Sequence, residues 1–238
     1  MKSLKNFIFS GLAMRSFFKA TYAIIRKDVA LEYRTKEILN SMLVFALLVV
    51  VVFSFIFDPG QEEQRRVAAG VYWMALIFSG LLGLGKSMQH EVTGGNIEAL
   101  ILTPVSRNAI LFGKVFSNFI FMLVMQLVML PLFVVLYEVN LVSNLYMVVV
   151  IAGVTYGFVL LGTLFSLIAA RSRAREIMLP LLLLPVLVPL VLAAIQTSSS
   201  VLAGEELIEY IRWVRLIVVF DIMFTAIATV VFDAVVEE

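Results

Sequence analysis

The chain has 238 residues, of which 62% are hydrophobic, and its mean hydropathy is +1.03. Soluble domains are about half apolar, so this composition predicts a membrane protein. The formal net charge of +1 favours neither nucleic acid nor an acidic substrate, and the lack of cysteine excludes disulfides, iron–sulfur clusters and cysteine-based zinc sites. The N-terminus does not resemble a cleaved signal peptide, because Arg15 and Lys19 follow its short apolar run.

Residues 1–37 are expected to form a cytoplasmic amphipathic helix. Aromatic and aliphatic residues recur at helical spacings between Phe17 and Tyr33, and basic residues lie among them. This pattern suits a helix on the membrane surface. It suits almost as well a helix that packs on the spans of the protein itself.

Six apolar stretches follow, each close to the roughly 20 residues that a membrane-spanning helix needs. They are Ile38–Phe57, Val67–Met88, Ala109–Tyr137, Leu145–Ala170, Ile177–Ile195 and Val214–Val236. The predicted fold is an all-α membrane protein, with residues 38–238 forming one six-span domain. The outer stretch from Gln196 to Arg212 is expected to be a loop that includes a short helix dipping into the membrane.

The basic residues predict the orientation of these spans. Residues 1–37 contain eight Lys and Arg, Lys86 to Lys114 contain three, and Arg171 to Arg175 contain three more. These 14 lie on one side, against four on the other: Arg65, Arg66, Arg212 and Arg215. By the positive-inside rule, both termini and the loop of residues 89–108 are cytoplasmic.

The loop of residues 89–108 is predicted to contain a short apolar helix. Gly94-Gly95 ends the preceding helix, Asn96 can cap the next one, and Pro104 stops it. An apolar helix in a polar loop needs a surface to pack on. The membrane surface and a cytosolic partner subunit are both candidates.

Three motifs suggest chemistry that their context argues against. Gly80 to Ser87 matches the Walker A pattern, but it ends an apolar span, whereas a phosphate loop follows a strand. Its glycines suit helix packing instead. His90, the single histidine, is expected to be a surface residue rather than a heme or metal ligand. The methionines, including Met122, Met125 and Met129, are expected to face lipid or to pack in the core rather than to act as soft ligands.

Other residues within or beside the spans are candidates for a conformational role. Pro180, Pro185 and Pro189 can bend the fifth span, and either a static bend or a deformable element fits them. Gly153 and Gly157 have the spacing of a helix-packing motif. Asp221 is costly in a span unless it lies near the outer surface or pairs with an arginine. We find no hydrolase motif.

The order of these features resembles the ABC-2 class of exporter permeases and, within it, the CcmB family of the cytochrome c maturation (heme exporter) system. The loop has the pattern E-x-x-x-G-x-x-E-x-L-x-x-x-P, formed by Glu91, Gly95, Glu98, Leu100 and Pro104. The other stretches that show the resemblance are Arg26–Glu37, Phe53–Pro59, the Gly113–Lys114 pair and Leu179–Ala194. The resemblance covers roughly residues 22–238.

The resemblance implies a permease subunit of the bacterial inner membrane without catalytic residues or a metal of its own. Its five loop residues would form a coupling helix that docks on a cytosolic ATPase subunit, CcmA. Asp58 and Pro59, the three span prolines and Asp221 would be conformational or outer-mouth residues. CcmC and CcmD would be membrane partners, and the heme chaperone CcmE an indirect one. ATP would act only through CcmA, and heme would be the ligand transported or handled by the complex.

Two alternatives remain open at the level of sequence. An ABC-2 permease for a lipid, polysaccharide or drug would show the same spans and coupling loop. A membrane scaffold that holds the heme-handling subunit without transport would also be apolar. The chain lacks a convincing pair of heme ligands, which favours transmission of ATP-driven motion over heme ligation.

Overall fold

The computed structural model describes residues 2–56, 62–93, 105–139, 145–170 and 175–237. Within these ranges all regular structure is helical. The helices are α1 (Lys2–Thr35), α2 (Glu37–Ile56), α3 (Glu62–Thr93), α5 (Arg107–Tyr137), α6 (Leu145–Ala170), α7 (Arg175–Leu202) and α8 (Leu207–Glu237). Six of them, α2 to α8, are long and apolar enough to cross a membrane. The predicted fold class, an all-α protein with six spans, is confirmed.

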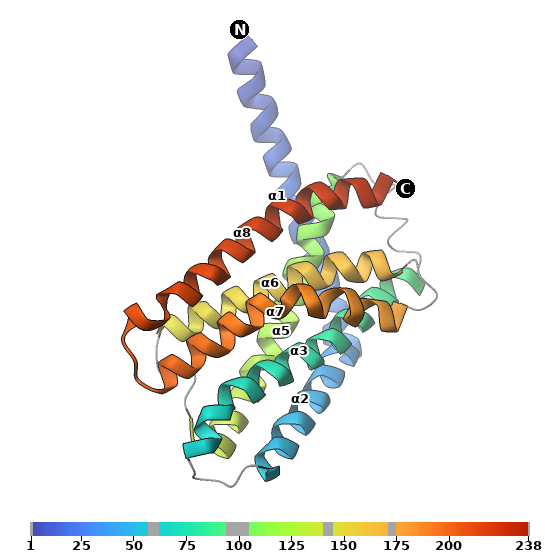
Figure 1. The fold of residues 1–238 in the computed structure, drawn as a ribbon. Coiled ribbons are helices and arrows are strands. Elements are labelled where there is room, and N and C mark those ends of the chain that lie inside the picture. The colour runs from blue at the N-terminus through green and yellow to red at the C-terminus, as the bar shows by residue number, and fades with distance from the viewer. Residues whose placement is uncertain (1, 57–61, 94–104, 140–144, 171–174, 238) are drawn as a thin grey trace.

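Two helices form the centre of the bundle. In the most apolar stretch of α3 72% of residues are buried, and in that of α6 67%, against 17% in α8. Helix α2 packs on α3, which follows it in the chain, and α6 packs on α7. Helix α8 lies along both α6 and α7 (Figure 1). The peripheral faces of α2 and α8 are therefore apolar and exposed, as expected for helices that meet lipid.

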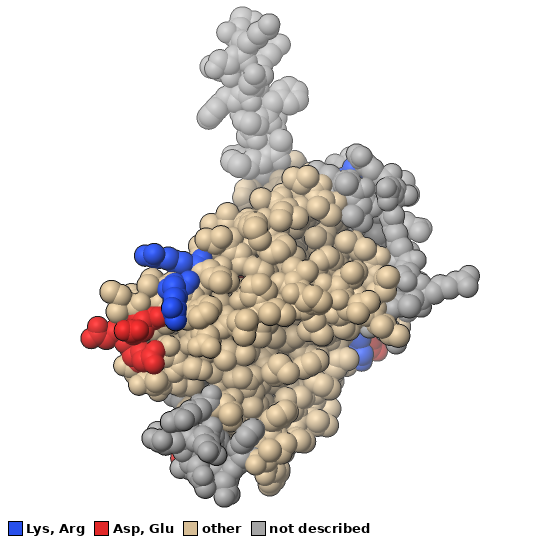
Figure 2. Space-filling view, in the orientation of Figure 1, with Lys and Arg blue, Asp and Glu red and all other residues tan. Residues whose placement is uncertain are grey.

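The surface charge is distributed as a membrane-spanning bundle requires. Figure 2 shows a broad uncharged band, with acidic and basic side chains gathered beside the beginning of α8. The exposed charged residues there are Glu205, Glu206, Glu209, Arg212 and Arg215. Arg212 also lies over the ring of Trp213, at 5.1 Å from the ring centroid. Such an arrangement suits the boundary between hydrocarbon and water.

The stretch that matches Walker A lies wholly inside α3 and serves packing. A Cβ atom on Gly80 would lie 2.5 Å from the ring of Phe158 in α6, and one on Gly83 would lie 2.4 Å from the sulfur of Met42 in α2. These two glycines let the neighbouring helices approach. The expectation that the glycines of this stretch serve helix packing is confirmed for Gly80 and Gly83. Met122, Met125 and Met129 are buried in the core, so core packing is confirmed for them.

The structure corrects the predicted ends of three spans. α3 continues past Met88 to Thr93, α7 continues past Ile195 to Leu202, and α8 begins at Leu207 rather than Val214. The predicted outer loop of residues 196–212, with its separate dipping helix, is therefore wrong. Only residues 203–206 join α7 to α8. Gly204 makes the turn with φ +74°, and the amide of Glu205 donates to the carbonyl of Ser200, which closes the helix end.

The polar residues near the end of α7 are the reason for that error. Thr197 and Ser198 look like the beginning of a loop, but both are fully buried. The indole N–H of Trp73 in α3 donates to Ser198 Oγ at 2.9 Å, and this hydroxyl donates to the carbonyl of Ala194. The hydroxyl is satisfied inside the bundle, so the helix continues through it.

Candidate functional site

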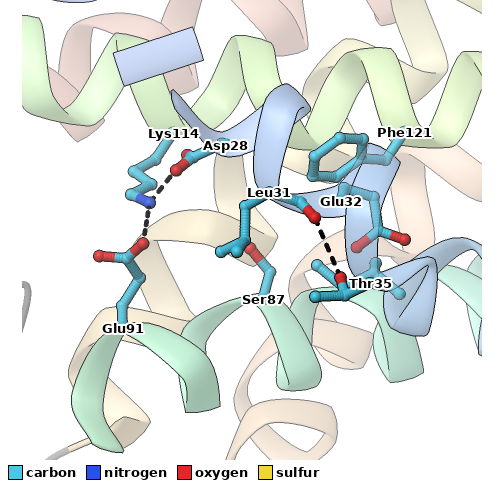
Figure 3. A pocket seen from close by; sticks show the side chains of 9 residues that line it. Asp28, Leu31, Glu32, Thr35, Ser87, Glu91, Lys114 and Phe121 are labelled. Carbon is cyan, nitrogen blue, oxygen red and sulfur yellow. Dashed lines mark hydrogen bonds and ion pairs between the residues drawn. The ribbon is translucent and has the colours of Figure 1, made fainter. Parts of the chain in front are cut away.

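Four charged side chains from three helices meet where the end of α3 reaches the beginning of α5. Lys27 and Asp28 come from α1, Glu91 from the last turn of α3, and Lys114 from α5. We call these four residues the ion cluster. Lys114 Nζ lies 2.8 Å from Asp28 Oδ2 and 2.6 Å from Glu91 Oε1 (Figure 3). Lys27 Nζ lies 3.0 Å from Glu91 Oε1 and 3.2 Å from Asp28 Oδ1.

The ion cluster forms because α1 lies close against α5. Thr21, Ile24, Asp28 and Glu32 recur every three or four residues and form the buried face of α1. Gly113 permits the approach, since a Cβ atom there would lie 2.8 Å from Ile24 Cγ2. Thr21 Oγ1 also donates to the carbonyl of Ala109. The next residue after Gly113 is Lys114, which is thus held directly over Asp28.

The cluster is buried and electrically balanced. Asp28, Glu91 and Lys114 are 7%, 3% and 4% exposed, whereas the Lys27 side chain is 45% exposed. Two ammonium groups face two carboxylates, so no net charge is left in the apolar surroundings. Burial of an unpaired charge is strongly unfavourable, and each charged group here therefore depends on its partners.

The ionisation of Glu91 and Lys27 reflects this mutual dependence. Burial by itself would raise the pKa of Glu91, but the charge of Lys114 and the hydrogen bonds from both lysines outweigh burial and lower it. Burial would lower the pKa of Lys27, but Asp28 and Glu91 outweigh burial and raise it. Both groups are held in their charged forms at neutral pH.

A narrow crevice beside the cluster reaches the junction of α1 and α2. Asp28, Leu31, Glu32, Thr35, Ile38, Ser87, Glu91, Lys114 and Phe121 line it. Lys36 separates the two helices with φ 56°, and the Glu32 carboxylate accepts the amide N–H of Leu39 at 2.8 Å. Glu32 thereby caps the first turn of α2, where a negative charge is favourable. The cluster and the first span are thus connected through α1.

Of the five predicted coupling residues, the structure describes only Glu91. Glu91 lies in the ion cluster, while Gly95, Glu98, Leu100 and Pro104 lie outside the described residues, as do Asp58 and Pro59. His90 is in the last turn of α3, and its side chain is not among those described. Among the described residues no group of three His, Asp or Glu is placed to hold a metal.

The predicted conformational residues lie elsewhere in the bundle. Pro180, Pro185 and Pro189 are inside α7, which continues through all three; Pro185 and Pro189 are exposed. Asp221 lies in the middle of α8 and packs against Gly153 and Gly157 of α6. The structure therefore does not bring the prolines, Asp221 and Glu91 into one site. The packing role of Gly153 and Gly157 is confirmed.

Sequence reasoning missed Asp28 and Lys114 as site residues. A signal was present, because Lys114 stands seven residues inside α5 in an otherwise apolar stretch, and such a charge is costly without a partner. The sequence does not show which acidic residue pairs with Lys114, since Asp28 is 86 residues away and Glu91 is 23 residues away.

The all-helical fold with its six candidate spans defines a multi-pass helical membrane protein of the permease type. A family model described as CcmB protein matches residues 19–238, and the chain belongs to this family.

Three relatives carry the name heme exporter protein B. That of Rhodobacter capsulatus is 26% identical over 167 residues, which are 70% of this chain and 77% of the relative. That of Haemophilus influenzae Rd is 26% identical over 187 residues, 77% of this chain and 81% of the relative. That of Escherichia coli K12 is 27% identical over 97 residues, 41% of this chain and 44% of the relative, so under half of its length is matched.

Proposed function

We propose that this chain is the membrane-spanning permease subunit of an ABC complex for heme export in cytochrome c maturation. Membership of the CcmB family and the name heme exporter protein B of its relatives support this substrate. The six apolar helices support a permease. The chain would have no catalytic residues of its own, and ATP would be hydrolysed by the cytosolic ATPase subunit, CcmA.

The proposed location is the bacterial inner membrane, with both termini in the cytoplasm. The excess of basic residues, 14 against four, supports this orientation. The ion cluster then lies at the cytoplasmic end of the bundle. The loop that begins after Thr93 faces the ATPase, and the turn at residues 203–206 faces the periplasm.

The observation that carries the coupling role is the contact between Glu91 and Lys114. Glu91 belongs to the first part of the proposed coupling loop, residues 89–108, which forms the last turn of α3, and stands three residues before Gly94. Its carboxylate is joined to Lys114 in α5 and to Lys27 in α1. A displacement of the loop by the ATPase would pull on the end of α3 and would reach α5 and α1 through these short ionic contacts.

In this proposal the chain handles heme indirectly. Its one histidine lies in the last turn of α3, at the cytoplasmic end, whereas heme is delivered at the periplasmic side. CcmC would handle heme, with CcmD beside it, and the permease would transmit ATP-driven motion that delivers heme or releases the loaded chaperone CcmE. The Asp28, Glu91 and Lys114 side chains would serve as mechanical contacts and not as heme ligands.

Glu91→Gln tests the coupling role, because it keeps the side-chain shape and removes the charge that Lys114 requires. We expect the variant to keep co-purifying with the ATPase, while the yield of holo-cytochrome c falls. The rate of ATP hydrolysis should then be the same whether or not the ATPase is assembled into the complex. The exchange of both charges, Glu91→Lys with Lys114→Glu, should restore part of the yield. Leu127→Ile, on a side chain that is 71% exposed, is the control and should change nothing.

The outcomes separate the rival functions. Unchanged holo-cytochrome c and unchanged ATPase coupling in Glu91→Gln would reject the coupling role. Replacement of residues 94–104 by a neutral linker without any effect would support a scaffold. Normal holo-cytochrome c in a strain that lacks the chain would support an exporter of a lipid, polysaccharide or drug.

A further inference from the structure

The strongest unexplained feature outside the ion cluster is the carboxylate of Asp221. Asp221 stands 14 residues after Leu207 and 11 before Phe232, the ends of the apolar stretch of α8. At a rise of about 1.5 Å per residue it lies about 9 Å beyond Arg215, the last charged residue at the membrane boundary, and about 16 Å before Phe232, so it stands inside the hydrocarbon region. An ionisable group at this depth is costly and calls for a partner.

The carboxylate is seated on α6 by two glycines. A Cβ atom on Gly157 would lie 2.3 Å from Asp221 Oδ1, and one on Gly153 would lie 3.5 Å from Asp221 Oδ2. Only glycine at position 157 leaves room for this carboxylate against the α6 backbone. Two nearby side chains on the exposed face of α8, Val218 and Ile222, are 50% and 67% exposed. Asp221 thus lies at the edge of the contact between α6 and α8, beside the exposed face of α8.

No charged group of the described chain compensates Asp221. Its Oδ1 atom is buried and has no hydrogen-bond partner among the described residues. Nearby, Thr225 Oγ1 donates to the backbone carbonyl of Asp221 and contacts Tyr156 Oη, so these hydroxyls are engaged elsewhere. The facing stretches of α6 and α7, residues 145–169 and 177–202, contain no Lys, Arg, His, Asp or Glu.

A second copy of the chain in the same orientation has no basic residue of its apolar stretches level with Asp221. The basic residues inside the six apolar stretches are Lys86, Arg107, Lys114, Arg212 and Arg215. All of them stand within eight residues of the end of their stretch, and Lys114 is already paired with Asp28 and Glu91. Lipid tails have neither a charge nor a hydrogen-bond donor to offer.

We propose that Asp221 marks a docking site, on the exposed face of α8 beside α6, for a transmembrane helix of a different chain that presents a basic side chain at the depth of Asp221. The apolar side chains Val218 and Ile222 would pack on that helix. The ion pair would set the register of the two helices, since a charge in hydrocarbon tolerates little displacement from its partner. This site is separate from the ion cluster and does not depend on the coupling role.

Site-directed photo-cross-linking in native membranes that hold the whole complex tests this docking site. The chain has no cysteine, so Ile222→Cys can carry a benzophenone maleimide next to Asp221. Leu48→Cys, on the exposed face of α2, is the matched control at similar depth and 56% exposure. No ATP or heme is added, so failure of this experiment would leave the proposed heme role untouched.

We expect Ile222→Cys to cross-link a different membrane chain within one helical turn of a Lys, Arg or His. This adduct should fall to background when Asp221→Asn is added, while the products of Leu48→Cys stay the same. Cross-links to lipid alone, to a second copy, or to a helix without a basic residue would overturn the proposal, as would an adduct that Asp221→Asn does not weaken. If Asp221→Asn does not accumulate in the membrane, the cross-link formed by Ile222→Cys with Asp221 intact tests the proposal. Its position on the other chain must then lie within one helical turn of a basic residue.

Discussion

At the scale of single residues, Lys114 is the key charge of the described site. Its ammonium is buried in α5 and neutralises carboxylates from two other helices, Asp28 and Glu91. A buried ion pair adds little net stability relative to apolar residues of the same size, but removing one partner leaves the other uncompensated. The ion cluster is therefore better understood as a specific connection between helices than as a source of stability.

Lys114→Met should destabilise the protein strongly. It leaves Asp28 and Glu91 buried with only the half-exposed Lys27 to balance them, and we expect a loss of about 3–5 kcal/mol. Thermal unfolding of the purified chain in detergent measures this loss. Lys19→Met, on an exposed position of α1, is the control and should stay within about 0.5 kcal/mol of wild type. Equal stability of Lys114→Met and wild type would mean that the cluster is not formed in solution.

The pH dependence of the cluster should be confined to the extremes. The pKa of Glu91 is lowered, so its contribution to stability is complete above the ordinary value of 4.5 and is lost as pH falls through its lower folded value. The pKa of Lys27 is raised, so its contribution is complete below the ordinary value of 10.5 and is lost as pH rises through its higher folded value.

Unfolding temperatures of wild type and Glu91→Gln should therefore differ by a constant amount between pH 6 and 9, pH values that lie well inside this window. The difference should shrink in acid, where Glu91 is protonated in both states. A difference that changes steeply near neutral pH would contradict the charge assignment of Glu91 and Lys27.

At the scale of the helices, small residues decide how closely α2, α3 and α6 approach. The two glycines of α3 that contact other helices, Gly80 and Gly83, stand against large buried side chains. Gly85 belongs to the same stretch but has no atom within 4 Å of its Cβ position. Neighbouring glycines of one motif thus have different structural roles.

Gly80→Ala and Gly85→Ala should have opposite effects. The first places a methyl group 2.5 Å from the ring of Phe158, which is 1% exposed and cannot move aside, and we expect a loss of about 1–3 kcal/mol. The second fills open space in a helix and should be neutral or stabilise by about 0.5–1 kcal/mol. Thermal unfolding of both variants tests the pair. Equal losses in the two would argue against helix packing as the role of Gly80.

At the scale of the whole molecule, the ends of the bundle differ in charge and in construction. One end carries the ion cluster and the junction of α1 with α2, and the other carries the tight turn between α7 and α8. Among the described residues, the ionic contacts that join α1, α3 and α5 lie at the first end. An ATPase that acts on one face of the membrane would engage this end if the orientation is as proposed.

Cysteine accessibility tests that orientation directly. Ser106→Cys and Glu205→Cys introduce single thiols at exposed positions on opposite ends of the bundle. A membrane-impermeant maleimide should label Glu205→Cys in intact cells and Ser106→Cys only after the cells are opened. Labelling of Ser106→Cys in intact cells would invert the orientation and would place the ion cluster on the outer side.

The sequence alone determined the class of protein and the number of its spans, because hydrocarbon requires about 20 consecutive apolar residues and this signal is local. It also pointed to the packing role of the glycines in α3 and to Glu91. Its errors lie where distant residues decide. α7 continues through Ser198 because Trp73, 125 residues away, donates a hydrogen bond to it.

Only the tertiary structure decided which charges meet. Lys27 and Glu91 are 64 residues apart, and nothing in the spacing of either residue names the other as its partner. The same holds for Asp221, whose seat on α6 depends on Gly157. Apolar length is a property of one segment, whereas neutralising a buried charge requires a side chain from another segment, and only the packing of the helices brings the two together.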